Sequence, residues 1–323
     1  MPSALADGHL KTLILKLMFR KKYLLRTSLV LLALLLILIL SAPLPRFNKP
    51  CSTVVLASDG QLLGARIATD GQWRFPSNDT VPEKFRTCII QFEDQYFRYH
   101  PGVNLFAIGR AMVQNFRAKR VVSGGSTITM QVARMAGNGS SRTITHKLIE
   151  ILSALKLELL YSKKSIISLY ASNAPFGGNM VGIEAACWRY FGHSASRLSW
   201  AEAATLSVLP NAPSLIFPGN NDQKLKTKRD KLLKKLLERK IIDPLDCELA
   251  IDEPIPDKPF ALPDHSFHLT ERLKKSNLGE RIITGINYQL QQQVKDLVRE
   301  HSSQLASQHI FNASAIVIDV KTN

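Results

Sequence analysis

The chain has 323 residues, of which 45% are hydrophobic, so it can bury one substantial core and a smaller unit, and it is not a disordered protein. Its 42 basic and 26 acidic residues give a formal net charge of +16, which favours an anionic partner. Nucleic acid is disfavoured as that partner, because the sequence has no metal-finger spacing, no aromatic RNA-binding motif and no basic-leucine pattern.

The N-terminal segment predicts a membrane anchor. Residues 1–26 form a basic tail, and residues 27–45 are uncharged and dominated by Leu and Ile. A cleaved signal peptide is the alternative, but the apolar run is long for one, and Pro43 and Pro45 crowd the place of a cleavage site. We expect a single-pass helix with a cytoplasmic N-terminus and everything after Arg46 outside. The cysteines there can pair or serve as buried thiols, and they receive no function.

Residues 46–80 predict a small β-hairpin region between the anchor and the main domain. Apolar runs flank Asp59-Gly60 and Asp70-Gly71, dipeptides that favour tight hairpin turns. Residues 81–253 show apolar residues at helical spacing, so the main domain should be mostly α. Within it, residues 224–240 combine leucines with nine basic residues and predict an amphipathic packing helix, with lipid contact as the alternative.

The last part of the chain predicts a linker and the truncated start of another domain, over residues 254–323. Four prolines between residues 254 and 263 interrupt any helix. Beyond them, residues 288–301 predict an amphipathic helix and residues 313–320 a strand.

Two clusters in the main domain place polar groups in settings that suit catalysis. In the first, Glu93 and Asp94 stand among aromatic residues, and a partly desolvated carboxylate is a better proton acceptor near neutrality. A capped helix end explains that cluster equally well. In the second, the Gly- and hydroxyl-rich run 123–131 leads into a helix whose free backbone N–H groups can hold an anion, although an ordinary N-cap explains half of it.

Two further clusters follow. Lys147 and Glu150 share one face of a predicted helix over residues 142–158, but such a pair is more often a surface ion pair worth under about 1 kcal/mol. Residues 163–204 are rich in small side chains around the run 174–178, which predicts close helix packing.

In this order and spacing, the four clusters resemble the motifs of the peptidoglycan glycosyltransferase family over residues 81–214. Residues 99–104, 125–134 and 174–178 further resemble the penicillin-binding protein 1C branch. The resemblance implies a mainly α, lysozyme-like glycosyltransferase domain with an N-terminal transmembrane helix, a small β-hairpin region and the truncated start of a transpeptidase domain. It also implies a periplasmic catalytic domain at the bacterial inner membrane.

The activity that the resemblance implies is polymerisation of lipid II into β-1,4-linked glycan strands, with undecaprenyl diphosphate as leaving group. Glu93 matches the family's general base, and Glu150 matches a second essential carboxylate that organises the diphosphate end. The residues matched to substrate binding are Asp94, Phe97, His100, Ser126, Thr127, Gln131, Arg134, Arg142, Lys147 and Lys163. A divalent cation, Mg or Mn, near Glu150 stays open.

The partners implied are lipid II, the growing glycan strand and membrane lipid, with other cell-wall synthesis proteins as an open addition and no nucleic acid. A segment from residue 105 to residue 122 resembles the family's membrane-dipping lip, with core burial as the alternative.

The sequence departs from the family at several positions. His146 stands where many relatives have Arg, Met130 where many have Gln, and Ser168 and Ser172 where Glu and Asn are common. The tail from residue 283 contains neither Ser-x-x-Lys nor Lys-Thr-Gly, so we expect no transpeptidase activity. A non-catalytic membrane-anchored scaffold and a lysozyme-like glycan-cleaving enzyme are the alternatives, since a fold does not fix a reaction.

Overall fold

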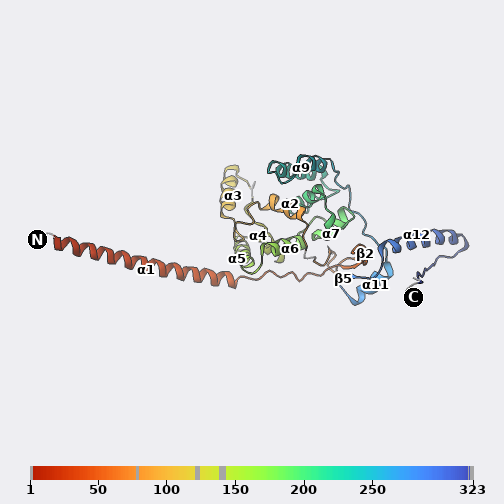
Figure 1. Cartoon of the computed structure of the whole chain (residues 1–323), viewed down its shortest axis with the longest axis horizontal. Helices are drawn as coiled ribbons and strands as arrows, with labels where there is room; N and C mark the ends of the chain where they lie inside the picture. Colours follow the sequence, from red (N-terminus) through yellow and green to blue (C-terminus); the bar gives the residue numbers. More distant parts are fainter. Residues whose placement is uncertain (1–2, 78–79, 121–123, 138–142, 319, 321–323) are drawn as a thin grey trace. The chain divides into compact units, whose positions relative to one another are not determined.

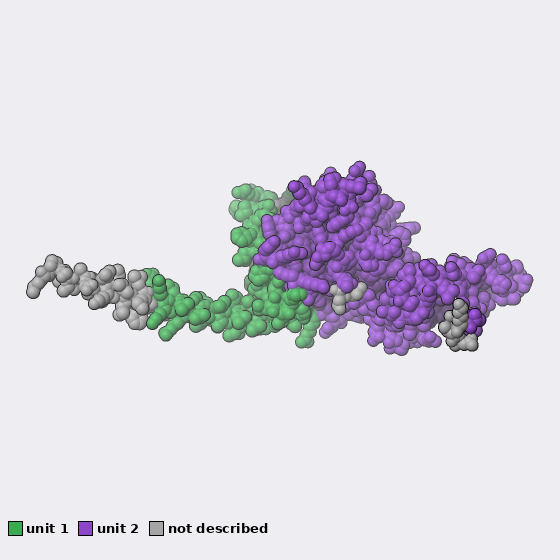
Figure 2. Space-filling view, in the orientation of Figure 1, with its two compact units in different colours: residues 1–46, 100–162 green, residues 47–99, 163–323 purple. Residues whose placement is uncertain are grey.

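The computed structural model of the chain describes residues 3–77, 80–120, 124–137, 143–318 and 320. Helices make up most of the regular secondary structure among the described residues, and the strands are few and short. This confirms the mainly α fold class. The chain divides into two compact units: unit 1 comprises residues 1–46 and 100–162, and unit 2 comprises residues 47–99 and 163–323 (Figure 2). The five-segment division drawn from the sequence stays a prediction, because these units describe packing and not domain boundaries.

Unit 1 is helical (Figure 1). Its helices are α1 (Ser3–Ser41), α3 (Leu105–Ala118), α4 (Ile128–Ala136) and α5 (Ile144–Leu160). Residues 20–41 of α1 begin with basic side chains and continue as an apolar, largely exposed run with a mean hydropathy of 2.6, and 22 residues at about 1.5 Å each are long enough to cross a bilayer. The helix ends at Ser41, before the predicted end of the anchor at residue 45, because Pro43 and Pro45 cannot continue it.

Side-chain caps fix where the shorter helices of unit 1 begin. Asn104, Thr127 and Thr143 accept hydrogen bonds from backbone N–H groups in the first turns of α3, α4 and α5, and each such cap is worth about 1 kcal/mol. Gly102 has a φ of +86°, and a Cβ there would lie 2.8 Å from the carbonyl oxygen of Ala154. Glycine therefore lets the turn before α3 approach the backbone of α5.

Unit 2 combines helices with two small sheets. Its helices are α2 (Glu83–Glu93), α6 (Lys163–Asn173), α7 (Ile183–Tyr190), α8 (Trp200–Val208), α9 (Asp222–Glu238), α10 (Pro244–Asp252), α11 (Phe267–Ser276) and α12 (Tyr288–Leu305). Its strands are β1 (Thr53–Leu56), β2 (Leu62–Arg66), β3 (Trp73–Arg74), β4 (Met180–Val181) and β5 (Arg281–Ile283).

The three-stranded sheet of unit 2 has the order β2-β1-β5. The antiparallel β1–β2 pair, with Val55 opposite Gly64, confirms the predicted hairpin. The parallel pair of β1 with β5 places Val55 opposite Ile282, and no sequence signal predicted it. Figure 1 shows the blue strand β5 in the same small sheet region as the orange strand β2, and β1 lies between these two strands in the sheet.

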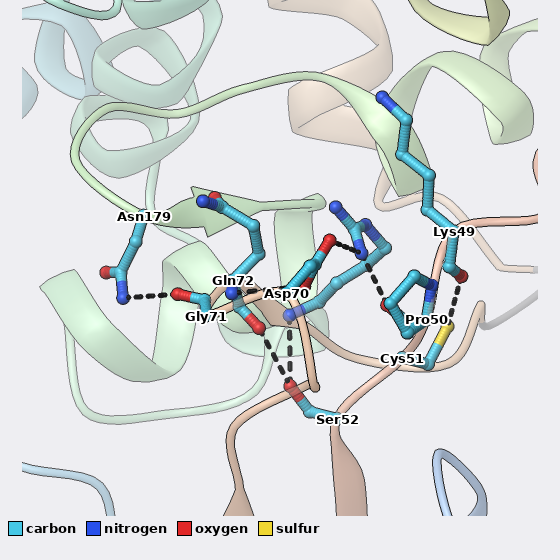
Figure 3. A network of polar contacts seen from close by, with 9 residues as sticks. Lys49, Pro50, Cys51, Ser52, Asp70, Gly71, Gln72 and Asn179 are labelled. Atoms are coloured by element: carbon cyan, nitrogen blue, oxygen red, sulfur yellow. Dashed lines mark hydrogen bonds and ion pairs between the residues drawn. The ribbon is translucent and has the colours of Figure 1, made fainter.

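The segment just before β1, with Pro50 and Ser52, is bonded to the region around β3, a strand of the two-stranded sheet (Figure 3). Arg74 is only 6% exposed, and its guanidinium donates to the carbonyl oxygen of Pro50 and, over 3.0 Å, to a carboxylate oxygen of Asp70. The backbones of Arg74 and Ser52 also bond at 2.7 Å. Burial opposes ionisation of Asp70, but hydrogen bonds from Arg74 and Gln72 outweigh it and lower the pKa of this carboxyl.

The helix α9 packs by the apolar face that its sequence predicted. Four of its leucines are at most 3% exposed: Leu225, Leu232, Leu233 and Leu236. Burying each contributes roughly 1.5–3 kcal/mol relative to exposure, so packing and not lipid contact accounts for the leucine periodicity. Its buried Arg229 donates to the carbonyl oxygens of Ile251 and Glu253 and thereby caps the C-terminal end of α10.

One predicted element is wrong. Residues 311–318 have no regular secondary structure, although residues 313–320 were expected to form a strand. Ile316 and Ile318 are 86% and 70% exposed. An apolar run forms a strand only against a hydrogen-bonding neighbour, and no strand among the described residues pairs with it. The predicted amphipathic helix before it is confirmed as α12.

Candidate active site

Three predicted site residues of unit 1 form one connected polar cluster. The Lys147 ammonium donates to the Ser126 hydroxyl over 2.8 Å and to the Glu150 carboxylate over 2.9 Å. Lys147 and Glu150 both lie on α5, whereas Ser126 immediately precedes Thr127, the N-cap of α4. The cluster therefore brings an ammonium and a hydroxyl to the positive end of a helix, an arrangement suited to an anion.

The Lys147–Glu150 pair differs from an ordinary surface ion pair in its exposure. The carboxylate side chain of Glu150 is 16% exposed, whereas the side chain of Lys147 is 41% exposed. The less exposed Glu150 thus binds the ammonium, and part of the Lys147 side chain stays accessible to a ligand. An ammonium that is already held in position needs little rearrangement when negative charge develops nearby.

Hydroxyl groups hold α4 in place within unit 1. Thr127 donates to the carbonyl oxygen of Gly102 over 2.5 Å, and Thr129 donates to the Glu158 carboxylate over 2.6 Å. Thr127 and Gln131 are 2% and 8% exposed. These two predicted binding residues therefore shape the start of α4 from inside, and Thr129 and Glu158 are supporting residues that sequence reasoning missed.

A pocket of about 270 Å³ lies beside this cluster, entirely within unit 1. Its polar lining includes Arg134, His146 and Glu150. His146, one of the predicted departures from the family pattern, therefore lines this pocket. His100 is half-buried, and Arg142 lies outside the described residues.

The predicted site residues of unit 2 gather around the C-terminal end of α2. Glu93 is the last residue of that helix and is half-buried, and Asp94 is the C-cap, 7% exposed. Phe97 is 1% exposed, and the Lys163 ammonium lies 4.4 Å from the centre of its ring. This cation–π contact fixes Lys163, the first residue of α6, against the aromatic residue predicted to line the cleft.

The end of α2 that carries Glu93 is held by α9. Arg239 donates to the side-chain oxygens of Gln91 and Gln95, each over 2.7 Å. Lys235 donates to the carbonyl oxygen of Gln91 in the last turn of α2, where a cation also interacts favourably with the helix dipole. These supporting residues had no sequence signal beyond the basic face of α9.

The predicted site residues fall into two groups, one in each unit. The unit 1 group is Ser126, Thr127, Gln131, Arg134, Lys147 and Glu150, with His100 in the same unit. The unit 2 group is Glu93, Asp94, Phe97 and Lys163. Ser172, on α6, lines a separate small cavity with Gly182 and Glu184, and Ser168 is half-buried on the same helix.

A divalent cation finds little support from the side chains near Glu150. No group of three or more His, Cys, Asp or Glu residues within the described ranges could hold a metal ion. Glu150 is also hydrogen-bonded to an ammonium, which competes with a cation for the carboxylate. A single paired carboxylate does not by itself supply the oxygen-rich shell that Mg²⁺ or Mn²⁺ prefers.

Comparisons with known proteins agree on one family. Residues 59–237 match the family described as Transglycosylase. The chain is 34% identical over 278 residues to penicillin-binding protein 1C of Escherichia coli K12, covering 86% of this chain and 36% of that protein. It is 36% identical over 212 residues to penicillin-binding protein 1A of Aquifex aeolicus, covering 66% of this chain and 29% of that protein.

A structural comparison also finds a penicillin-binding protein. The crystal structure of penicillin-binding protein 1A from Haemophilus influenzae aligns with 86% of this chain and 33% of its own, at 18% identity and a TM-score of 0.37. The chain spans about a third of the length of the curated relatives it matches.

Proposed function

Because this chain belongs to the transglycosylase family, we propose that it is a peptidoglycan glycosyltransferase, which polymerises lipid II into β-1,4-linked glycan strands and releases undecaprenyl diphosphate. The proposal covers the activity, the substrate and the partners of the whole protein. The observation that carries it is the cluster of Ser126, Lys147 and Glu150 beside a pocket lined by Arg134.

The cluster of unit 1 is assigned to the leaving group. A departing diphosphate gains negative charge as the glycosidic bond breaks, and cations already held in position stabilise that charge best. Lys147 is held by Glu150 and Ser126, and Arg134 adds a guanidinium that can bind phosphate oxygens through two parallel hydrogen bonds. Glu150 then acts by orienting Lys147.

Glu93 is assigned as general base for the acceptor sugar hydroxyl. It is half-buried at the end of α2, a helix whose last turn is fixed by Lys235 and Arg239. The deprotonated hydroxyl attacks the donor carbon opposite the departing diphosphate, so the configuration at that carbon inverts. Asp94 and Phe97 are assigned to the lining of the substrate cleft, and Lys163 is assigned to the leaving diphosphate.

The proposed membrane placement is supported by unit 1. The likeness to penicillin-binding protein 1C and the apolar helix α1 are compatible with anchoring in an inner membrane. The proposal adds that the basic N-terminus is cytoplasmic and the rest of the chain periplasmic. In α3, Leu105, Phe106 and Phe116 are 76%, 91% and 86% exposed, so the alternative that this helix is buried in the core is wrong. Exposed apolar side chains support the interpretation that α3 contacts lipid.

Polymerisation of labelled lipid II by the detergent-solubilised full chain tests the proposal. We expect glycan polymer on a gel from the unmodified chain and a loss of at least about 100-fold in Glu93→Gln, the usual contribution of a general base. Glu83→Gln is the matched control, because Glu83 lies at the other end of α2 and its side chain is 69% exposed. Circular dichroism checks that each variant is folded.

The outcomes separate the three candidate functions. A glycosyltransferase consumes lipid-linked monomer, a glycan-cleaving enzyme consumes finished polymer, and a scaffold consumes neither. Normal turnover in folded Glu93→Gln would remove Glu93 from the role of base. Glu150→Gln should also lose activity, and parallel reactions with Mg²⁺ and with EDTA show whether a divalent cation contributes.

A further inference from the structure

The short segment that follows the membrane helix is bonded to α5. The Lys156 ammonium donates to the carbonyl oxygens of Leu40 and Ala42 over 2.6 and 2.7 Å, and the Ser153 hydroxyl donates to that of Pro43 over 3.1 Å. Ser153 and Ala42 are 4% and 7% exposed. We call residues 42–46 the exit segment.

These bonds satisfy groups that a helix end leaves without partners. The last carbonyl groups of α1 have no N–H donor within the helix, and they carry the negative end of its dipole. An ammonium is the favourable partner there, since it supplies both hydrogen bonds and opposite charge. Lys156 and Ser153 therefore hold the exit segment in one place on α5.

That place is the wall of the pocket beside the Lys147–Glu150 pair. Residues 43–46 line the pocket together with Arg134, His146 and Glu150, and all of them belong to unit 1. Ser153 is one helical turn from Glu150, so the same face of α5 holds the exit segment and presents the carboxylate. Arg46 adds a second guanidinium to the pocket lining, and its positive charge is complementary to the negative charge of a phosphate ligand.

We propose that Arg46 is a further binding residue for the diphosphate of a prenyl diphosphate, and that the exit segment forms one wall of the donor site. The inference rests on the proposed function and deepens it. A diphosphate carries several negative charges, and guanidinium groups bind phosphate oxygens in pairs. Leu44 and Ile149 give the same pocket an apolar part, which suits the first carbons of the prenyl chain.

Binding of farnesyl diphosphate to the full chain in detergent tests the inference without turnover. By isothermal titration we expect Arg46→Ala to weaken binding about 5-fold, as the loss of one exposed charge-assisted contact to a phosphate implies. Arg46→Lys should recover part of the affinity. Lys49→Ala is the matched control: it removes the same charge three residues away, and Lys49 does not line the pocket.

Inorganic pyrophosphate and farnesol separate the two parts of the ligand. Arg46→Ala should weaken the binding of pyrophosphate as much as that of farnesyl diphosphate. Farnesol should bind equally weakly to Arg46→Ala and to the unmodified chain. Equal affinity of Arg46→Ala and the unmodified chain, or an equal loss in Lys49→Ala, would overturn the inference. Tight, Arg46-dependent binding without any polymerisation of lipid II would uphold it and reject the proposed function instead.

Discussion

His265, in the loop before α11, is bonded to both β2 and α12 in unit 2. Its backbone N–H donates to the carbonyl oxygen of Leu63 over 2.7 Å, and its own carbonyl accepts from Gln291 over 2.9 Å. Its ring lies edge-on to Tyr288, with Nε2 3.2 Å from the phenol oxygen. Burial, and then the nearby Lys295, lower the pKa of His265, although Asp264 and Asp296 act in the opposite direction.

The lowered pKa predicts a loss of stability on acidification. The folded state favours the neutral ring, so this contribution is complete above the unfolded pKa of about 6.5 and is lost as pH falls through the folded pKa. Hydrogen exchange in α12, corrected for the intrinsic rate, should therefore quicken between pH 7.5 and pH 5. His265→Asn should remove most of this change, whereas substitution of the exposed His268 by Asn should leave it; an unchanged pH response in His265→Asn would contradict the assignment.

At the scale of elements, the pairing of α9 with α2 controls the candidate base. The two helices pack within unit 2, and Arg239 bonds to residues on both sides of Glu93. The apolar period of α9 predicted that it packs, but it did not identify its neighbour. Two basic side chains at the end of this helix, Lys235 and Arg239, support the end of α2, and the sequence did not predict that contact.

Removal of Arg239 should therefore affect turnover more than substrate binding. We expect Arg239→Ala to lower kcat by roughly 3- to 10-fold, the effect of losing about 1 kcal/mol of positioning, with KM nearly constant. Lys231→Ala removes a charge from an exposed position of the same helix and should change neither value. A rise in KM alone would show that Arg239 acts on substrate binding and not on the position of Glu93.

At the scale of the whole molecule, charge and exposed apolar surface favour the same environment. The net charge of +16 suits an anionic lipid surface, and the large exposed apolar side chains of unit 1 belong to α1 and α3 as well as α5. A helix with exposed Leu, Phe and Met among arginines is typical of the membrane interface.

Tryptophan quenching tests that environment. In vesicles containing brominated lipids, a full chain carrying Phe106→Trp on α3 should lose a large part of the added fluorescence. Leu245→Trp is the control, because Leu245 is also exposed, at 64%, but lies on α10 in unit 2. Equal quenching at both positions, or none at position 106, would count against lipid contact by α3.

The sequence predicted local structure better than long-range partners. Helical periodicity located α5, α9 and α12, and Asp-Gly pairs located the hairpin, because these signals act over a few residues. The family motifs named Ser126, Lys147 and Glu150 as site residues, but only the structure shows that Lys147 bonds to both of the others. The exit segment and the pairing of β1 with β5 depend on residues far apart in the chain, for which one sequence gives no signal. The false strand at residues 313–320 has the same origin, since a strand is defined by its neighbour.

The β1–β5 pairing has a consequence for the order of chain synthesis. Leu56 accepts a hydrogen bond from Thr284, 228 positions later. The hairpin is complete once residue 66 has been made, but the second edge of β1 stays open until β5 emerges. At the usual synthesis rate of 5–20 residues per second, that interval lasts roughly 10 to 45 s. During it, the unpaired edge is a template for any extended chain nearby, so early contact with a chaperone or the membrane surface would protect the nascent protein.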